Sequence, residues 1–187
     1  KNITTGSGTN VVYTESANVT ATGGSGKDTF YSGSGTNRLM GGAGSDTYIF
    51  AKGHGQDVIF DFANGSVSDD TLKFLDVNST EVKFGRSGDN LIVFGYNGAD
   101  QITIEKFFLG STYAMEVFEF ADKKITYSEL IKTSIPAFTT EDQANLLVAQ
   151  AELDAARTLS QVMSPASYLI SDELFGNDGS GNTLSSF

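Results

Sequence analysis

The sequence predicts a mainly β protein: a parallel β-roll, capped by an antiparallel β region and followed by a carboxy-terminal helix and a flexible tail. Three observations support this fold class. Glycine-rich units recur every nine residues near the amino terminus. Apolar and polar residues then alternate between turn signals from Asp70 to Phe120, and beyond Ile125 apolar residues recur at helical spacing. A fixed period of this kind is typical of repeat folds, in which neighbouring units stabilise one another.

The repeated unit has the form Gly-Gly-x-Gly-x-Asp-x-U-x, in which U is apolar. Two units match it fully, residues 23–31 (GGSGKDTFY) and 41–49 (GGAGSDTYI). Three units of the same length lack Asp at the sixth position: residues 5–13 (Asn10), 14–22 (Val19) and 32–40 (Asn37). A last unit, residues 52–60 with Asp57, follows two inserted residues.

The eighth position of every unit is apolar, and this column predicts the core. Two units make one turn of a flattened helix, each with a loop and a short strand, so these side chains should point inward between two sheets. The column consists of Val12, Ala21, Phe30, Leu39, Tyr48 and Ile59.

The loops offer the oxygen ligands that Ca²⁺ prefers. Ca²⁺ takes roughly six to eight hard oxygen ligands from carboxylates and backbone carbonyls. Loops 18 residues apart stack on the same edge of the roll, so an ion can bind between them. The best site is expected between Asp28 and Asp46. Its other ligands are expected to be the carbonyl groups of Gly24, Gly26, Gly41 and Ala43.

Weaker sites are expected elsewhere in the stack. Between Asn10 and Asp28 only one side chain carries a full charge. On the opposite edge Val19 breaks the first pairing, while Asn37 is expected to pair with Asp57 across the inserted residues.

An acidic turn after the repeats offers one more candidate. Asp61, Asp69 and Asp70 lie in a Gly-containing turn, where they either close a site with Asp46 or are ordinary solvated turn residues. His54, the only histidine, occupies a third loop position. Only its carbonyl group is expected to bind an ion, and its imidazole is expected to have no role.

Residues 1–60 are thus expected to form the β-roll, and residues 61–127 a β region that covers its open sheet edge. Alternating patterns predict short strands at residues 71–74, 81–84, 91–94, 101–104 and 115–120. Asp89-Asn90 and Asn97-Gly98 mark hairpin turns.

The repeats and the stretch that follows resemble the RTX family of secreted calcium-binding proteins. After the nonapeptides the resemblance continues through Tyr48-Ile49-Phe50, Gly53-His54-Gly55-Gln56-Asp57, Asp70-Thr71-Leu72, Gly88-Asp89-Asn90-Leu91 and Phe118-Glu119-Phe120-Ala121-Asp122. It covers about residues 5–127. The family implies a parallel β-roll, several Ca²⁺ ions as the cofactor, and export by a type I ABC transporter that reads an uncleaved carboxy-terminal signal.

The resemblance also implies a ligand pattern: the first, third and sixth residues of one loop and the second, fourth and sixth of its partner. Together with the acidic turn, the expected metal ligands are Gly6, Gly8, Asn10, Gly23, Gly24, Ser25, Gly26, Asp28, Gly33, Gly35, Asn37, Gly41, Gly42, Ala43, Gly44, Asp46, Lys52, His54, Asp57, Asp61 and Asp70.

Residues 128–163 are expected to be helical, and residues 164–187 to be a flexible tail that carries the export signal. Thr140 to Gln143 fits a capping box, and Pro165 ends the helix. One helix face is apolar, with Leu147, Ala151, Ala155, Leu159 and Val162. This face either packs on the β region or contacts the transporter or a membrane during export.

Composition narrows the functional classes. The chain has 187 residues, with 23 Asp and Glu against 12 Lys and Arg, and its net charge of −11 disfavours nucleic acid and anionic lipid as partners. It lacks Cys, and no apolar run approaches the ~20 residues of a membrane-spanning helix. It starts at Lys1 with neither Met nor an apolar signal region, so we expect a piece of a longer protein.

No enzymatic activity is expected of this segment. A Ser–His–carboxylate triad would require His54, and no Gly-x-Ser-x-Gly turn precedes a helix. Strand alternation and a turn explain Glu116, Glu119 and Asp122 better than a catalytic carboxylate pair does.

We therefore expect a calcium-binding module of a secreted, extracellular protein that folds where Ca²⁺ is abundant. The parent protein is expected to be a toxin. The alternatives are the distal end of a surface adhesin, whose β region binds a receptor or glycan, and the tail of a secreted lipase or protease. The expected partners are Ca²⁺, the transporter and the upstream domains of the same polypeptide; a target membrane or receptor is reached only through the parent protein.

Overall fold

The computed structural model describes residues 1–15, 18–62 and 68–163. The chain divides into two compact units, Lys1–Val148 and Ala149–Phe187. The first unit contains the repeats, the β region and every site described below. The tail expected at residues 164–187 lies outside the described residues, so its export signal stays a prediction.

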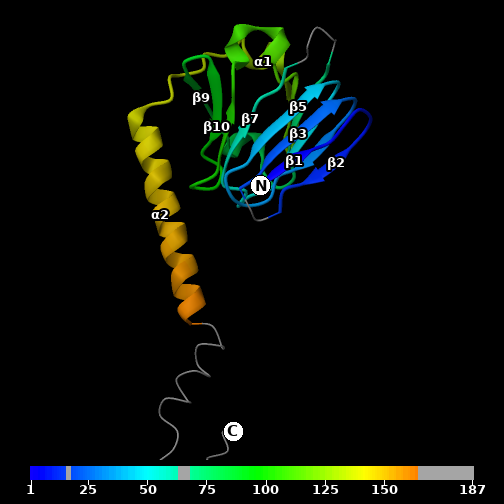
Figure 1. Ribbon diagram of the computed structural model, residues 1–187. Helices are drawn as coiled ribbons and strands as arrows, with labels where there is room; N and C mark the ends of the chain where they lie inside the picture. Colours follow the sequence, from blue (N-terminus) through cyan, green and yellow to red (C-terminus); the bar gives the residue numbers. More distant parts are fainter. Residues whose placement is uncertain (16–17, 63–67, 164–187) are drawn as a thin grey trace, which may run out of the picture. The chain divides into compact units, whose positions relative to one another are not determined.

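Alternate repeats contribute to one seven-stranded sheet, called sheet A. Its parallel strands are β1 (Asn2–Thr4), β3 (Thr20–Ser25), β5 (Arg38–Ala43) and β7 (Gln56–Ile59). In Figure 1, β1, β3 and β5 lie side by side. Ala21 of β3 pairs with Leu39 of β5 at a spacing of 18 residues, whereas Leu39 pairs with Ile59 of β7 at a spacing of 20. The longer spacing reflects the two inserted residues.

The other repeats form a six-stranded sheet, called sheet B. Its parallel strands are β2 (Val11–Tyr13), β4 (Thr29–Tyr31), β6 (Thr47–Phe50) and β8 (Thr71–Phe74). Because one nine-residue unit is half a turn, successive strands lie in opposite sheets and the loops between them stack along two edges. The predicted fold class, mainly β with a parallel β-roll, is confirmed.

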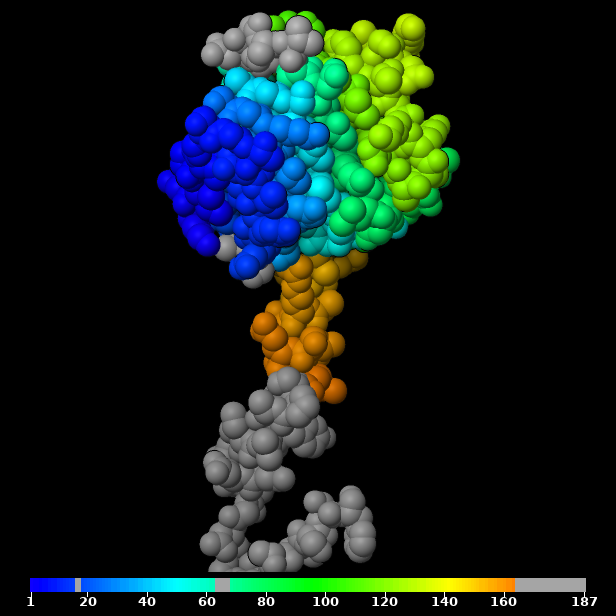
Figure 2. Space-filling view, turned by 90° about the vertical axis from the view of Figure 1, so that its right-hand side faces the viewer, coloured from blue at the N-terminus to red at the C-terminus, as the bar shows by residue number. Residues whose placement is uncertain are grey.

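The region after the repeats extends both sheets. In sheet A, β11 (Gln101–Ile104) pairs in parallel with β7, and β10 (Asn90–Phe94) and β9 (Lys83–Ser87) follow as antiparallel neighbours. In sheet B, β12 (Val117–Glu119) is parallel to β8 and antiparallel to β13 (Lys124–Thr126). On the face shown in Figure 2, the blue-to-cyan repeats and the green β region form one continuous surface. The expected antiparallel pairing therefore holds for the hairpins, but the strands that contact the roll continue its parallel ladders.

The eighth-position column forms the core, as predicted. Each of its six residues is at most 4% exposed, and Phe30 stacks on Tyr48 with ring centroids 5.2 Å apart. The β region extends the same cluster with Leu72, Leu91 and Phe118. Full burial of an apolar side chain of this size contributes about 1.5–3 kcal/mol, so the column ties the two sheets together.

A short helix follows β13, and an extended segment beyond it covers the far edge of sheet A. The helix α1 (Tyr127–Leu130) begins after Thr126, whose side chain accepts a hydrogen bond from the Glu129 N–H. Further on, the Arg86 N–H of β9 donates to the Pro136 carbonyl, and the Phe138 N–H donates to the Arg86 carbonyl, each at 2.8 Å. These bonds satisfy backbone groups that an open edge would expose.

The helix α2 (Thr140–Val162) is capped one residue earlier than the sequence predicts. Thr139 Oγ1 accepts from the Asp142 N–H at 3.1 Å, and the Thr139 N–H donates to Asp142 Oδ2 at 2.8 Å. Leu146 is buried, whereas Leu147, which was expected on the packing face, is 58% exposed. Over the described ranges, no helix is both long enough and apolar enough to span a membrane.

Candidate metal centre

The sixth-position side chains of one loop edge form a continuous ladder that Asp70 extends; this set, Asn10, Asp28, Asp46 and Asp70, is called the first edge. Each carboxylate accepts a hydrogen bond from the backbone N–H of the preceding member. The Asn10 N–H donates to Asp28 Oδ1 at 2.9 Å, and the Asp28 N–H donates to Asp46 Oδ1 at 2.7 Å. The Asp46 N–H donates to Asp70 Oδ1 at 2.7 Å, and the Asp70 N–H to Glu116 Oε2 at 2.8 Å. The first edge therefore stacks carboxylates along the roll.

The glycines of the repeats let this stack form inside the protein. Asp28 and Asp46 are both 0% exposed. Gly44, two residues before Asp46, has a φ of 128°, and a Cβ there would collide with the Gly26 carbonyl of the neighbouring loop. Glycine permits both the positive φ and the close approach, so adjacent loops are held in contact around the carboxylates.

One oxygen of each of these two carboxylates has no protein partner. Asp28 Oδ2 and Asp46 Oδ2 are the only carboxylate oxygens in the described ranges that are buried without a hydrogen bond. Asp28 Oδ2 and the Gly41 carbonyl oxygen converge on a space that only glycine leaves open, because a Cβ on Gly23 would collide with both. An unpaired buried carboxylate is costly, and converging oxygens of this kind fit a hard cation.

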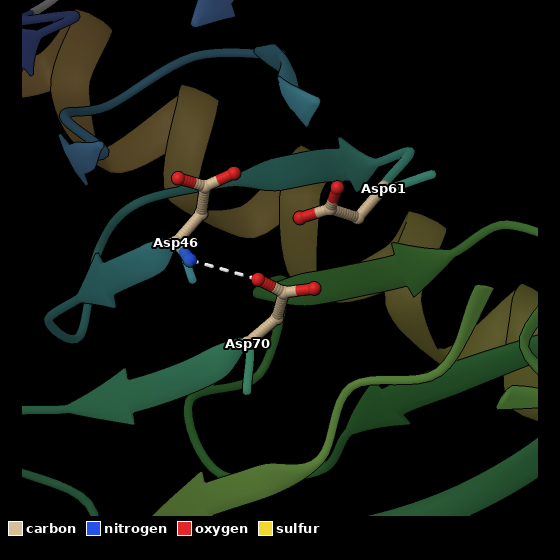
Figure 3. A group of neighbouring side chains, drawn as sticks. All are labelled: Asp46, Asp61 and Asp70. Carbon is tan, nitrogen blue, oxygen red and sulfur yellow. Dashed lines mark hydrogen bonds between the residues drawn. The ribbon is translucent and has the colours of Figure 1, made fainter. Parts of the chain in front are cut away.

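Asp46, Asp61 and Asp70 form a second group of oxygens, in which the three carboxylates face one another (Figure 3). One ligand atom of each lies within 4.8 Å of those of the other two. The Tyr48 hydroxyl donates to Asp61 Oδ2 at 2.5 Å and accepts from the Gly41 N–H at 2.7 Å. The structure thus brings the acidic turn to Asp46, as one of the two sequence interpretations expected.

Burial and mutual repulsion raise the pKa of these carboxyl groups. Burial, and then the charges of Asp61 and Asp28, raises the pKa of Asp46 to about 7. Burial, and then the charge of Asp61, raises the pKa of Asp70 to about 8. Burial also raises the pKa of Asp61 and of Glu116. These raised pKa values show that no nearby positive charge within the described residues compensates the clustered carboxylates. A bound divalent cation would supply that charge.

The loop before Asp28 is arranged differently. Asn10 Nδ2 donates to the carbonyls of Gly6 and Gly8 at 3.2 Å each and to Asp28 Oδ1 at 2.7 Å. These three oxygens were expected to bind an ion. The weaker site expected between Asn10 and Asp28 stays a prediction; in the structure an amide nitrogen donates to its candidate ligand oxygens.

The opposite loop edge, called the second edge, consists of Val19, Asn37 and Asp57. The Val19 N–H donates to Asn37 Oδ1 at 3.1 Å, and the Asn37 N–H donates to Asp57 Oδ1 at 2.7 Å. Asp57 Oδ2 lies 2.7 Å from His54 Nδ1 and accepts from the Ser32 hydroxyl at 3.1 Å. Both Asp57 oxygens have protein partners, and the site expected between Asn37 and Asp57 stays a prediction.

The His54 imidazole, which was expected to take no part in ion binding, has a structural role. The residue is 2% exposed, and its Nε2 lies 2.7 Å from the Tyr96 hydroxyl. Since a carboxylate accepts hydrogen bonds, His54 Nδ1 donates to Asp57, and Nε2 is paired with the Tyr96 hydroxyl. The ring turns into the protein because Asp57 and Tyr96 offer it partners there.

Asp100 closes the second edge beyond this loop. Its Oδ2 accepts from the Gly53 N–H at 2.7 Å and its Oδ1 from the Gly55 N–H at 3.0 Å. Lys52 was expected to offer its carbonyl group, and this stays a prediction; its ammonium group pairs with Glu81 at 2.7 Å. The second edge thus ends on hydrogen bonds to a carboxylate rather than on a further loop.

Comparison with known families decides which ion this arrangement concerns. Residues 4–39 and 22–57 match the RTX calcium-binding nonapeptide repeat (four copies), and residues 87–122 match the haemolysin-type calcium binding protein related domain. The chain carries an RTX calcium-binding repeat region. The repeat matches contain the loops from Asn10 to Asp57 but not Asp61 or Asp70, and the ion implied for the repeat oxygens is Ca²⁺.

The sequence interpretation missed the roles of three residues around these sites. Glu116 was assigned to strand alternation, and its separation of 46 residues from Asp70 gives no periodic signal. Tyr96, which anchors His54, lies in no repeat. Tyr48 was assigned to the core alone, although its hydroxyl group sets it apart from the rest of the eighth-position column.

Without divalent cations, the RTX unit is expected to be more stable at pH 6 than at pH 8. The pKa values of Asp46 and Asp70 are raised from 3.8 to about 7 and about 8 in the folded chain. The contribution of these two groups to folding stability is therefore fully present below their pKa in the unfolded chain. It is lost as the pH rises through their pKa values in the folded chain. Thermal unfolding in EDTA at several pH values measures this trend.

Saturating Ca²⁺ should reverse the trend, because the ion binds the ionised carboxylates and competes with protons. A melting temperature in EDTA that rises from pH 6 to pH 8 would contradict the raised pKa values of Asp46 and Asp70.

Proposed function

We propose that this RTX region folds on binding Ca²⁺ and holds its ions on the first edge. The observation that carries the proposal is the pair of buried carboxylate oxygens without a protein partner, Asp28 Oδ2 and Asp46 Oδ2. The region is a Ca²⁺-binding module of RTX type, and proteins with such repeats are typically secreted. Its proposed role is a binding and folding role, not a catalytic one.

The two oxygens of each first-edge carboxylate face different gaps of the loop stack. Asp28 Oδ1 accepts from Asn10 on one side, whereas Asp28 Oδ2 lies next to the Gly41 carbonyl on the other. The first proposed site lies in that second gap, between Asp28 and Asp46. The Gly26 carbonyl, which is close to Gly44 of the next loop, adds a further oxygen.

The second proposed site is formed by Asp46, Asp61 and Asp70. Asp46 Oδ2 is the unpaired oxygen here, and a Cβ on Gly41 would collide with it and with the Tyr48 hydroxyl. Asp46 therefore serves both sites, with Oδ1 in the first gap and Oδ2 in the second. Because three carboxylates meet in a buried space, this site has the higher charge density, and charge is a main determinant of Ca²⁺ affinity.

The same carboxylates oppose folding when no ion is present. Their burial has a desolvation cost and their charges repel one another, while chain entropy favours the unfolded state. A bound ion offsets both terms, so its binding free energy becomes folding free energy. Extracellular calcium modules bind at roughly 10⁻⁴ to 10⁻³ M, which suits a protein that folds after leaving a calcium-poor cytosol.

Circular dichroism during a Ca²⁺ titration tests this proposal. We expect a cooperative gain of β-structure and a higher melting temperature at sub-millimolar to millimolar Ca²⁺, with a much smaller response to Mg²⁺, whose smaller octahedral shell these wide oxygen groups do not match. If the spectrum and melting temperature in EDTA equal those in Ca²⁺, the proposal fails.

A toxin as the parent protein, and export by a type I transporter, are the remaining parts of the proposal. They rest on the family resemblance and not on the site geometry. The sequence upstream of Lys1 tests the first part. Secretion of the chain with and without residues 164–187 tests the second, and unchanged secretion of the shortened chain would place the export signal elsewhere.

A further inference from the structure

The Asn10 side chain lies in the gap between the loops of Asn10 and Asp28. Its position corresponds to that of the ion proposed in the next gap, between Asp28 and Asp46. Its Nδ2 atom donates to Gly6 O, Gly8 O and Asp28 Oδ1. Gly6 and Gly8 are the second and fourth residues of their loop, and Asp28 is the sixth residue of the next loop. One gap further along, the equivalent oxygens belong to Gly24, Gly26 and Asp46. The same three kinds of oxygen thus surround an amide nitrogen in one gap and a candidate ion site in the next.

The hydrogen bonds separate the two gaps sharply. In the Asn10 gap, Asp28 Oδ1 accepts from both the backbone N–H and the side-chain amide of Asn10, at 2.9 and 2.7 Å. In the Asp28 gap, Asp28 has no N–H on its side chain, and its Oδ2 is left buried and unpaired. A neutral donor that satisfies buried oxygens removes the free-energy gain that an ion would provide.

On the second edge, too, side-chain N–H donors lie where an ion was expected, but they belong to other residues. Asn37 Nδ2 donates to the Gly33 carbonyl at 3.1 Å and to the Ser32 hydroxyl oxygen at 3.2 Å. The His54 imidazole donates to Asp57 Oδ2 at 2.7 Å. Gly33, Asn37 and Asp57 were expected to surround an ion. Instead the Gly33 carbonyl and Asp57 Oδ2 accept from side chains, and Asn37 Oδ1 accepts from the backbone N–H of Val19.

We propose that the N–H groups of Asn10, Asn37 and His54 replace Ca²⁺ in these gaps, so that part of the loop stack is held together without any ion. The amino-terminal gap and the second edge form an ion-independent scaffold, and Ca²⁺ binding is restricted to the first edge from Asp28 onward. This inference rests on the proposed calcium sites at Asp28–Asp46 and Asp46–Asp61–Asp70, and it adds which side chains decide where ions do not bind.

Counting bound ions by isothermal titration calorimetry, for the whole chain and two variants, tests the inference. The unaltered chain is expected to bind two ions, one at each proposed site. Asn10→Asp removes the amide donors and adds carboxylate oxygens beside Gly6, Gly8 and Asp28, so it should bind one ion more. Asn37→Asp is the matched control at the same register on the second edge. It should gain no ion, because His54 and Ser32 still occupy the Asp57 carboxylate.

Asn10→Ala supplies a second readout that does not depend on creating a site. It leaves Gly6, Gly8 and Asp28 without their amide donor, so the melting temperature should fall by the same amount in EDTA and in Ca²⁺, with no change in the number of bound ions. If Asn10 were a Ca²⁺ ligand, the loss would appear mainly in Ca²⁺ and the ion count would drop.

The outcomes distinguish this inference from the proposed function. If the unaltered chain binds no Ca²⁺, the proposed function fails. If it binds Ca²⁺ but already holds as many ions as Asn10→Asp, or if Asn10→Ala loses an ion, the replacement of Ca²⁺ by Asn10 is overturned. A gain of an ion by Asn37→Asp would overturn the part that concerns the second edge.

Discussion

Replacing Asp46 with asparagine is expected to abolish most of the stabilisation by Ca²⁺. Asp46 is shared by both proposed sites, and Asp46→Asn removes its charge while keeping an oxygen that can accept from the Asp28 N–H. An ion present at 100 times its dissociation constant stabilises a folded protein by about 2.7 kcal/mol, so loss of two ions corresponds to about 5 kcal/mol. The measured quantity is the difference in unfolding free energy between Ca²⁺ and EDTA.

Asp57→Asn is the matched control for this variant. Asp57 has the same register position on the second edge and is equally buried, at 1% exposed against 0% for Asp46. Its Oδ2 is hydrogen-bonded to His54 and Ser32, whereas Asp46 Oδ2 has no partner. Its replacement should lower stability in EDTA and in Ca²⁺ alike, leaving the difference unchanged. Equal effects of the two variants on that difference would refute the assignment of Ca²⁺ to the first edge.

A methyl group at Gly44 is expected to destabilise the roll strongly. Gly44→Ala adds a Cβ at a φ of 128° that collides with the Gly26 carbonyl of the neighbouring loop. Backbone strain of this kind costs about 1–3 kcal/mol, and the two loops must also separate, which moves the Gly26 oxygen away from the first proposed site. We therefore expect unfolding free energy to fall by about 3 kcal/mol in Ca²⁺, together with weaker Ca²⁺ binding.

Gly6→Ala distinguishes this crowding from a general effect of alanine in a repeat loop. Gly6 lies in the amino-terminal loop of the same edge, its φ lies outside the left-handed region, and a Cβ there has no atom within 4 Å. Its cost should stay within about 0.5 kcal/mol, as for most surface substitutions. Chemical denaturation of both variants in Ca²⁺ measures the contrast, and similar losses would contradict the role of close loop contact.

The regular part of the fold was predictable because its information is local. A nine-residue period places each eighth-position side chain on the same inner face, and Phe30 and Tyr48 stack as that pattern requires. The strands at 71–74 and 101–104 were also predicted with the observed bounds. Their partner strands were not predicted, because pairing with the roll depends on the path that the long connecting segments take back to it. Tyr48 pairs with Leu72 across 24 residues, a spacing that no period reveals.

The site was predictable to the same extent. Register alone predicts Asp28 with Asp46 as the best pair of carboxylates, and the structure brings both side chains into one ladder. It also showed where charge is missing, at Asn10 and Asn37, but not which groups take its place. The role of His54 was missed because its partner Tyr96 lies 42 residues away, outside the repeats.

The linear order of residues therefore determines that this protein is a stack of oxygen-rich loops around an apolar column, since period and residue type are written along the chain. Which loops can hold Ca²⁺ is decided in three dimensions. There Asp28 and Asp46 each keep one buried oxygen without a partner, while Asn10 and His54 fill the other gaps with N–H donors. The physical reason is that an ion binds where buried charge is left unsatisfied, and satisfaction depends on partners that only folding brings together.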